Sequence, residues 1–200
     1  MKIRQLFDAE TSTYSYLLWD EETREAALID SVDNQIERDL QLMEELGLTL
    51  KYTLETHIHA DHVTGSGRIR ERLGSKAVVH RNSRSECADV LVSDGDSITL
   101  GSQSVQVLET PGHTDTCVSY RIEGTVFTGD ALLIRGCGRT DFQPAMPARC
   151  MTPYTKSCSA CRTTPSCCRA MITTASVPPP SAKKRRTIHG WATPGRSRNL

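Results

Sequence analysis

Residues 57–62 read HIHADH, and this short stretch decides which fold the chain can adopt. It follows a strand-like KYTLET segment, so His57 and His59 alternate along an extended chain and can project to one side. Asp61 and His62 follow where the chain turns toward a predicted helix. Imidazole and carboxylate groups gathered at a strand end are typical of a metal site.

Two later segments place further metal-ligand types behind predicted strands. TPGHTDT carries His113 on a Pro-Gly turn, and VFTGDALL carries Asp130 directly after a strand. Strand ends can converge on one edge, so we expect a single cleft lined by His57, His59, Asp61, His62, His113 and Asp130. A ligand set without thiolate suits Zn(II) or Fe(II) in a reactive site rather than a structural zinc site.

Residues 1–143 alternate strand and helix signals, which predicts a strand-rich α/β fold with helices covering sheets. The apolar and β-branched segments predict strands at 14–19, 25–29, 50–56, 76–79, 105–109, 117–122 and 125–128. Helical spacing predicts helices at 34–46 and 64–73, each followed by a glycine that can end it. A hairpin is predicted within 93–109, turning at Gly101-Ser102.

The composition changes sharply after residue 143. All 24 acidic residues lie within 1–143 together with 14 of the 24 basic ones, so this part carries a net charge of −10. Residues 144–200 hold the other 10 basic residues, 8 of the 9 prolines and 5 of the 8 cysteines, and show no periodicity. We therefore predict a domain at 1–143 and an aberrant, disordered tail at 144–200.

The remaining features narrow the class of protein. The N-terminus has no apolar run long enough for a signal peptide or a membrane span, which predicts a cytoplasmic chain with reduced cysteines and no membrane partner. A net charge of zero argues against a nucleic-acid partner. His80 and His189 are expected to be surface histidines.

The order H-x-H-x-D-H, G-H-T and T-G-D resembles the metallo-β-lactamase superfamily, whose fold is an αββα sandwich with one or two metals. The resemblance covers residues 1–143, and FTGDALLIRGCGRTDFQ at 127–143 is similar to the persulfide dioxygenases. Their nearest relatives are the hydroxyacylglutathione hydrolases. Both groups continue with a second half of the sandwich and a late Pro-x-His-Asp-Tyr motif, which residues 144–200 do not supply.

The resemblance implies one Fe(II) per chain, held by His57, His113 and Asp130. The implied reaction is the oxidation of glutathione persulfide, or a related small persulfide, by O₂ to sulfite and glutathione. The residues implied to surround the ligands and hydrogen-bond to them and to water are His59, Asp61 and His62. Arg139 is a candidate for contacting glutathione or for bracing the site.

Two alternatives stay open. As a zinc-dependent hydroxyacylglutathione (thioester) hydrolase, the chain would bind two metals, with His59, Asp61 and His62 as ligands and Asp130 bridging. As a non-catalytic gene remnant, it would lack the part of the fold that the altered C-terminus should supply. The chain could act alone or as a homo-oligomer.

The tail also fits a shifted reading frame. Overlapping the codons of adjacent residues over 168–173 permits Pro-Gly-His-Asp-Tyr, with the Asp forced by Met171-Ile172. The same operation forces Asp at Met151-Thr152. We therefore place a frame shift near codons 143–145, so that the second half of the fold is missing from the translated chain.

Overall fold

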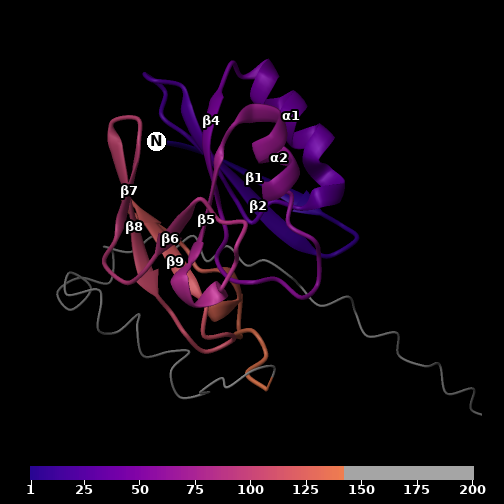
Figure 1. Ribbon diagram of the computed structural model, residues 1–200, viewed down its shortest axis with the longest axis vertical. Coiled ribbons are helices and arrows are strands. Elements are labelled where there is room, and N and C mark those ends of the chain that lie inside the picture. The colour runs from indigo at the N-terminus through magenta and orange to yellow at the C-terminus, as the bar shows by residue number, and fades with distance from the viewer. Residues whose placement is uncertain (142–200) are drawn as a thin grey trace, which may run out of the picture.

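The structure is a computed structural model that describes residues 1–141, and it consists of two packed β-sheets with two α-helices (Figure 1). The six-stranded sheet contains β1 (Lys2–Asp8), β2 (Thr13–Trp19), β3 (Glu25–Ile29), β4 (Thr49–Leu54), β5 (Lys76–His80) and β6 (Val90–Val92). The four-stranded sheet contains β7 (Ser97–Leu100), β8 (Gln103–Glu109), β9 (Val118–Ile122) and β10 (Thr125–Phe127). The helices are α1 (Ile36–Glu45) and α2 (Ser66–Leu73), and short 3-10 turns lie at Asp33–Gln35, Arg81–Ser83 and Gly129–Ala131.

The strand order places the ends of β3 and β4 side by side. The first sheet runs β1-β2-β3-β4-β5-β6, antiparallel through β3 and parallel from β3 to β6. The second runs β10-β9-β8-β7 and is antiparallel throughout. In the parallel pair Ile29 lies opposite Leu54, so the residues that follow both strands emerge at the same edge.

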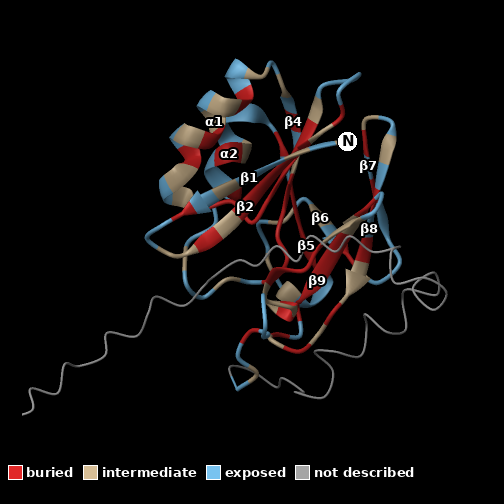
Figure 2. Ribbon diagram, turned by 180° about the vertical axis from the view of Figure 1, so that it is seen from behind, coloured by how far each residue is buried: buried red, intermediate tan, exposed pale blue. Residues whose placement is uncertain are grey.

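Alternation along the strands of the first sheet builds two separate cores. In β2, Leu18 belongs to the core between the sheets, whereas Leu17 belongs to the core beneath the helices. Ile36 and Met43 of α1 and Ile69 of α2 pack in that second core. Both helices cover the same face of the six-stranded sheet, and their outer sides are exposed (Figure 2). This arrangement is the helix–sheet–sheet part of the predicted αββα sandwich.

The outward face of the four-stranded sheet carries polar cross-strand pairs. Thr99 of β7 lies opposite Ser104 of β8, and Gln106 of β8 lies opposite Arg121 of β9. The Arg121 guanidinium donates to the Gln106 side-chain oxygen at 2.9 Å. These positions alternate with Val105 and Val107, which are buried between the sheets.

The predicted elements are confirmed, with shifts at their ends. The predicted strand 50–56 ends at Leu54 in β4, and the predicted helix 34–46 is the 3-10 turn at 33–35 followed by α1. The hairpin turns between Leu100 and Gln103 as expected. Strand β1 was not predicted, since it lies at the sheet edge and its burial follows no period of two. β6 was also missed, because three residues are too few to show alternation.

The predictions for the tail concern residues outside those described. These are disorder over 144–200, the frame shift and the surface position of His189. Over residues 1–141, no helix has the length and the apolar character needed to cross a membrane.

Asp39 is a buried acidic residue of α1. Its side chain is 1 % exposed, and one oxygen accepts a hydrogen bond from Arg38 Nε, while the other has no hydrogen-bond partner among the described residues. Burial raises the pKa of Asp39 to about 6, although the Arg38 guanidinium acts in the opposite direction.

We expect Asp39→Asn to make the fold more stable at neutral and alkaline pH than at acid pH, relative to wild type. The protonated carboxyl is favoured in the folded chain, so its contribution is complete below the unfolded pKa of 3.8 and is lost as the pH rises through about 6. Between acid and neutral pH, the free energy of unfolding of wild type should fall by about 3 kcal/mol relative to that of the variant. Urea unfolding at several pH values measures it. Glu37→Gln, on the exposed side of the same helix, is the control, and parallel curves for wild type and D39N would contradict the expectation.

Candidate metal centre

The segment that carries His57 lies at the seam between the two sheets. The Tyr120 hydroxyl donates to the Glu55 carbonyl at 2.9 Å, and the Val118 amide donates to the Thr56 carbonyl at 2.8 Å. The Ile58 amide donates to the Thr116 hydroxyl at 3.2 Å. These bonds fasten the loop after β4 to the beginning of β9, which positions ligands from the first sheet against ligands from the second.

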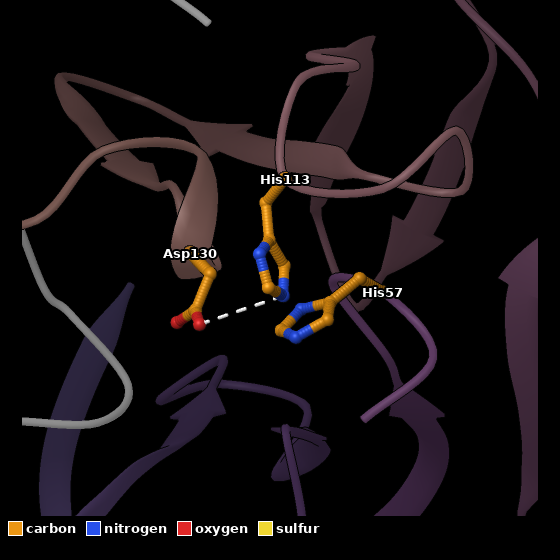
Figure 3. A group of neighbouring side chains, drawn as sticks. All are labelled: His57, His113 and Asp130. Atoms are coloured by element: carbon orange, nitrogen blue, oxygen red, sulfur yellow. Dashed lines mark ion pairs between the residues drawn. The ribbon is translucent and has the colours of Figure 1, made fainter. Parts of the chain in front are cut away.

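One group of metal-ligand types contains His57, His113 and Asp130. One ligand atom of each lies within 4.8 Å of the others, and His113 Nε2 is 3.7 Å from Asp130 Oδ2. The three side chains converge from three loops (Figure 3). Two imidazoles and one carboxylate form a set that could hold Fe(II) or Zn(II).

The tautomer of His57 follows from its neighbours. The Thr56 hydroxyl donates to Asp30 Oδ2 at 2.9 Å, so its proton is engaged and its oxygen can accept. His57 Nδ1 lies 3.0 Å from that oxygen, and we assign the ring proton to Nδ1. Burial, and then the neighbouring His59, His113 and His62, lower the pKa of His57 well below its usual value. His57 is therefore neutral, with the Nε2 lone pair available to a metal.

The loop after Asp130 fixes His113 in the same way. His113 Nδ1 lies 2.7 Å from the Arg139 carbonyl oxygen, which can only accept, so Nε2 is left with its lone pair. The Gly138 amide donates to the Asp130 carbonyl at 2.7 Å. A Cβ at Gly138 would lie 2.8 Å from the His113 ring and from that carbonyl oxygen. The loop therefore grips both ligands through its backbone.

The position of Asp130 depends on the close approach of the backbone at Gly129 to Thr56. It lies in the 3-10 turn after β10, next to Gly129, whose φ of +48° favours glycine. A side chain at Gly129 would collide with the Thr56 hydroxyl that orients His57. Burial raises the pKa of the Asp130 carboxyl, against the opposing effect of His113.

A second group contains His59, Asp61 and His62, again with ligand atoms within 4.8 Å of one another. His62 Nδ1 lies 3.3 Å from Asp61, and the Thr13 hydroxyl lies 3.4 Å from both side chains. Burial acts to raise the pKa of Asp61, but His62 and His59 outweigh it and lower this pKa to about 2. His62 Nε2 is buried and has no hydrogen-bond partner among the described residues, as suits a nitrogen directed at a metal or a water.

Two buried carboxylates hold His59 from behind. His59 Nε2 lies 3.1 Å from Asp30 and 3.4 Å from Glu55. Burial alone would lower the pKa of His59, but these carboxylates hold it well above its usual value. Glu55 also accepts the hydroxyls of Thr64 and Ser66. Behind the second group, the charges of Asp30 and Glu55 are thus compensated by His59.

Comparison with known proteins agrees with this geometry. The family model of the metallo-beta-lactamase superfamily matches residues 9–166. The chain belongs to this superfamily. Its solved relatives include ETHE1 from Myxococcus xanthus, with a TM-score of 0.75 and 51 % identity, over 78 % of this chain and 69 % of that one.

Two groups of curated proteins are similar to this superfamily member. The mitochondrial persulfide dioxygenase ETHE1 of Bos taurus is 51 % identical over 144 residues, which is 70 % of this chain and 56 % of that protein. The cytoplasmic hydroxyacylglutathione hydrolase of Arabidopsis thaliana is 38 % identical over 136 residues, 63 % of this chain and 51 % of that protein. The chain thus spans slightly more than half the length of these relatives. The resemblance inferred from the motifs is confirmed.

The six predicted cleft residues lie together, divided between the two groups joined by His57 and His59, whose ring centroids are 4.1 Å apart. Arg139 contributes its carbonyl oxygen to His113, while its side chain is 62 % exposed and pairs with Asp141. A contact between that side chain and glutathione stays a prediction.

Three buried residues of this metallo-β-lactamase fold were missed or misplaced. Asp30 and Glu55 were not predicted to support the site, although each is an acidic residue directly after a strand. His80 was expected at the surface, which is wrong. Its side chain is 3 % exposed and lies 2.9 Å from Glu109, because the carboxylate can satisfy a buried imidazole.

We expect Gly138→Ala to weaken metal binding by at least about tenfold, as for other changes behind metal ligands. The added methyl must displace the His113 ring or the Asp130 backbone. Metal titration after removal of bound metal measures the effect. Gly136→Ala is the matched control in the same loop, because a Cβ there meets no atom within 4 Å. Equal affinity in the two variants, both folded by circular dichroism, would contradict the grip of the loop on the ligands.

Proposed function

We propose that this chain is a persulfide dioxygenase, a metalloenzyme that converts glutathione persulfide, O₂ and water to glutathione and sulfite. We further propose that it uses one Fe(II), held by His57, His113 and Asp130. The observation that carries the proposal is the separate two-histidine, one-carboxylate group, in which each imidazole has its other nitrogen engaged. Such a set leaves positions on an iron for substrates. The similarity to persulfide dioxygenases supports the same reaction.

Iron, when bound, supplies the redox chemistry that a reaction with O₂ requires. The residues of the chain would then hold the iron and orient the reacting groups. His57 and His113 present their Nε2 atoms, and the Asp130 carboxylate lies 3.7 Å from His113 Nε2. His59, held by Asp30 and Glu55, keeps a cation beside the reacting groups. Asp61 and His62 would hold water and move protons near the oxidised sulfur.

Arg139 is the proposed contact for glutathione. Its guanidinium makes a bidentate contact with Asp141 at 2.8 and 3.0 Å, at the surface of the loop whose backbone holds His113. A carboxylate of glutathione can replace Asp141 in this geometry, since an Arg fork matches any carboxylate.

The zinc hydrolase is the second candidate. The observation in its favour is the second group, because His59 Nδ1, Asp61 and His62 also lie within reach of one ion. His59 donating from Nε2 to a carboxylate is the usual arrangement of a metal-bound histidine. Two metals would then activate a water for attack on a thioester.

The two candidates differ in metal content and in reaction. We expect iron-loaded protein to consume O₂ with glutathione persulfide and to leave the thioester of glutathione intact. Asp130→Asn should lose the metal, whereas Asp61→Asn should keep about one iron per chain, since only the first group holds it. Elemental analysis, an oxygen electrode and a thioester assay measure these outcomes. Loss of half the metal in Asp61→Asn, with thioester hydrolysis, would instead establish the zinc enzyme. A folded chain that binds no metal would establish the gene remnant.

We also propose that residues 144–200 arise from a shifted frame and that the protein acts in the cytoplasm. The change in charge at residue 144 supports the first proposal. We expect a fresh read of the coding DNA across codons 135–175 to show one base missing or extra relative to the recorded gene. A read identical to the recorded gene would show that the tail is genuine.

A further inference from the structure

A cavity of about 160 Å³ lies beside the two histidine groups. Its walls come from the loop after β4, the beginning of α2, β5 and the loop before β6. The residues that line it are Glu55, His57, Ile58, His59, His62, Thr64, Ser66, Gly67, Ala77, Val79, Ser85, Cys87 and Ala88.

The cavity approaches the site from the helix layer. Ala77 and Val79 of β5 alternate with Val78, which packs between the sheets, so they face the side of the first sheet that carries the helices. The lining includes His57 but neither His113 nor Asp130. Arg139, the proposed contact for glutathione, is likewise outside the lining. The cavity therefore reaches the metal ligands from a different direction than the loop that grips His113.

Most of the exposed wall is apolar, and several of its polar groups are bonded to one another. The hydroxyls of Thr64 and Ser66 both donate to Glu55, and His59 neutralises that carboxylate. Carbon atoms of Ile58, Ala77 and Val79 and of the small residues around them make up most of what remains.

This chemistry excludes glutathione as the occupant. The described lining residues include no lysine or arginine to bind its carboxylates, and the His59 imidazole is already engaged by Asp30 and Glu55. Apolar cavities of about 150 Å³ in other proteins accept benzene or xenon. A small uncharged molecule is the ligand that fits.

We propose that this cavity binds dioxygen and delivers it to the metal ligands at His57, separately from the persulfide. The inference rests on the proposed function, in which O₂ is the second substrate. Dioxygen is small and apolar, so it enters such a space without losing hydrogen bonds. In this proposal the persulfide is held on the side of Arg139, while O₂ arrives through the cavity beside His57.

The first test uses xenon, which reports an apolar gas site without any activity. Crystals of the full chain under xenon pressure should show a xenon atom against Ala77 and Val79, and ¹²⁹Xe NMR should show a shifted signal. Gly67→Leu should abolish that signal, since Gly67 lines the cavity and a Cβ there meets no atom within 4 Å. Gly124→Leu, in the β9–β10 turn with equally open space, is the control. Ordered water in place of xenon would overturn the proposal.

The second test measures kinetics of the iron-loaded chain. Gly67→Leu should raise the KM for O₂ by about threefold or more and leave the KM for glutathione persulfide and the iron content unchanged. Ala77→Val, which narrows the buried wall, should act in the same direction. Unchanged O₂ kinetics in both variants would overturn the delivery role. If wild type consumes no O₂ while xenon binds, the proposed function and the delivery role both fail, and the apolar gas site stands.

Discussion

The arrangement of the metal centre depends on one buried carboxylate, that of Asp30. It is 2 % exposed and accepts hydrogen bonds from the Thr56 amide at 2.7 Å, the Thr56 hydroxyl at 2.9 Å and His59 at 3.1 Å. A buried carboxylate without such partners would destabilise the fold by about 3–5 kcal/mol. The polypeptide must therefore bring these groups to Asp30, and in doing so it sets the positions of the site.

The pairing of the backbone strands places Asp30 close to these hydrogen-bond donors. Parallel pairing of β3 with β4 places Asp30 beside the loop that begins at Glu55, and the Asp30 amide donates to the Leu54 carbonyl at 2.9 Å. Asp30 has a φ of +50°, a conformation that Asp tolerates better than most residues and that turns its side chain back across the strand ends. From there the carboxylate reaches Thr56, and Thr56 in turn fixes the ring of His57. The protonation of a proposed ligand thus follows from the register of two strands.

Sequence patterns predict the parts of this structure that depend on local order. Strands, helices and the hairpin follow from alternation and glycine positions, and the six cleft residues follow from the rule that strand ends meet at an edge. The support layer could not be predicted in this way, since nothing local distinguishes Asp30 or Glu55 from an ordinary solvated carboxylate at a strand end. The grip of Gly138 and Arg139 on His113 was equally hidden, because it uses backbone atoms that any sequence possesses. His80 was misjudged for a related reason, as its partner Glu109 is 29 residues away.

The contacts that position the proposed ligands are contained within residues 30–139. Asp30 and Thr56 fix His57, and the carbonyl of Arg139 fixes His113. None of these bonds crosses the outward face of the four-stranded sheet, which among the described residues carries polar pairs such as Gln106 with Arg121. The proposed metal binding and the proposed recognition of glutathione therefore place different demands on the chain. The first needs the seam between the two sheets, where Thr56 and the Arg139 carbonyl hold the two histidines. The second would depend on the exposed Arg139 guanidinium, which pairs with Asp141 among the described residues.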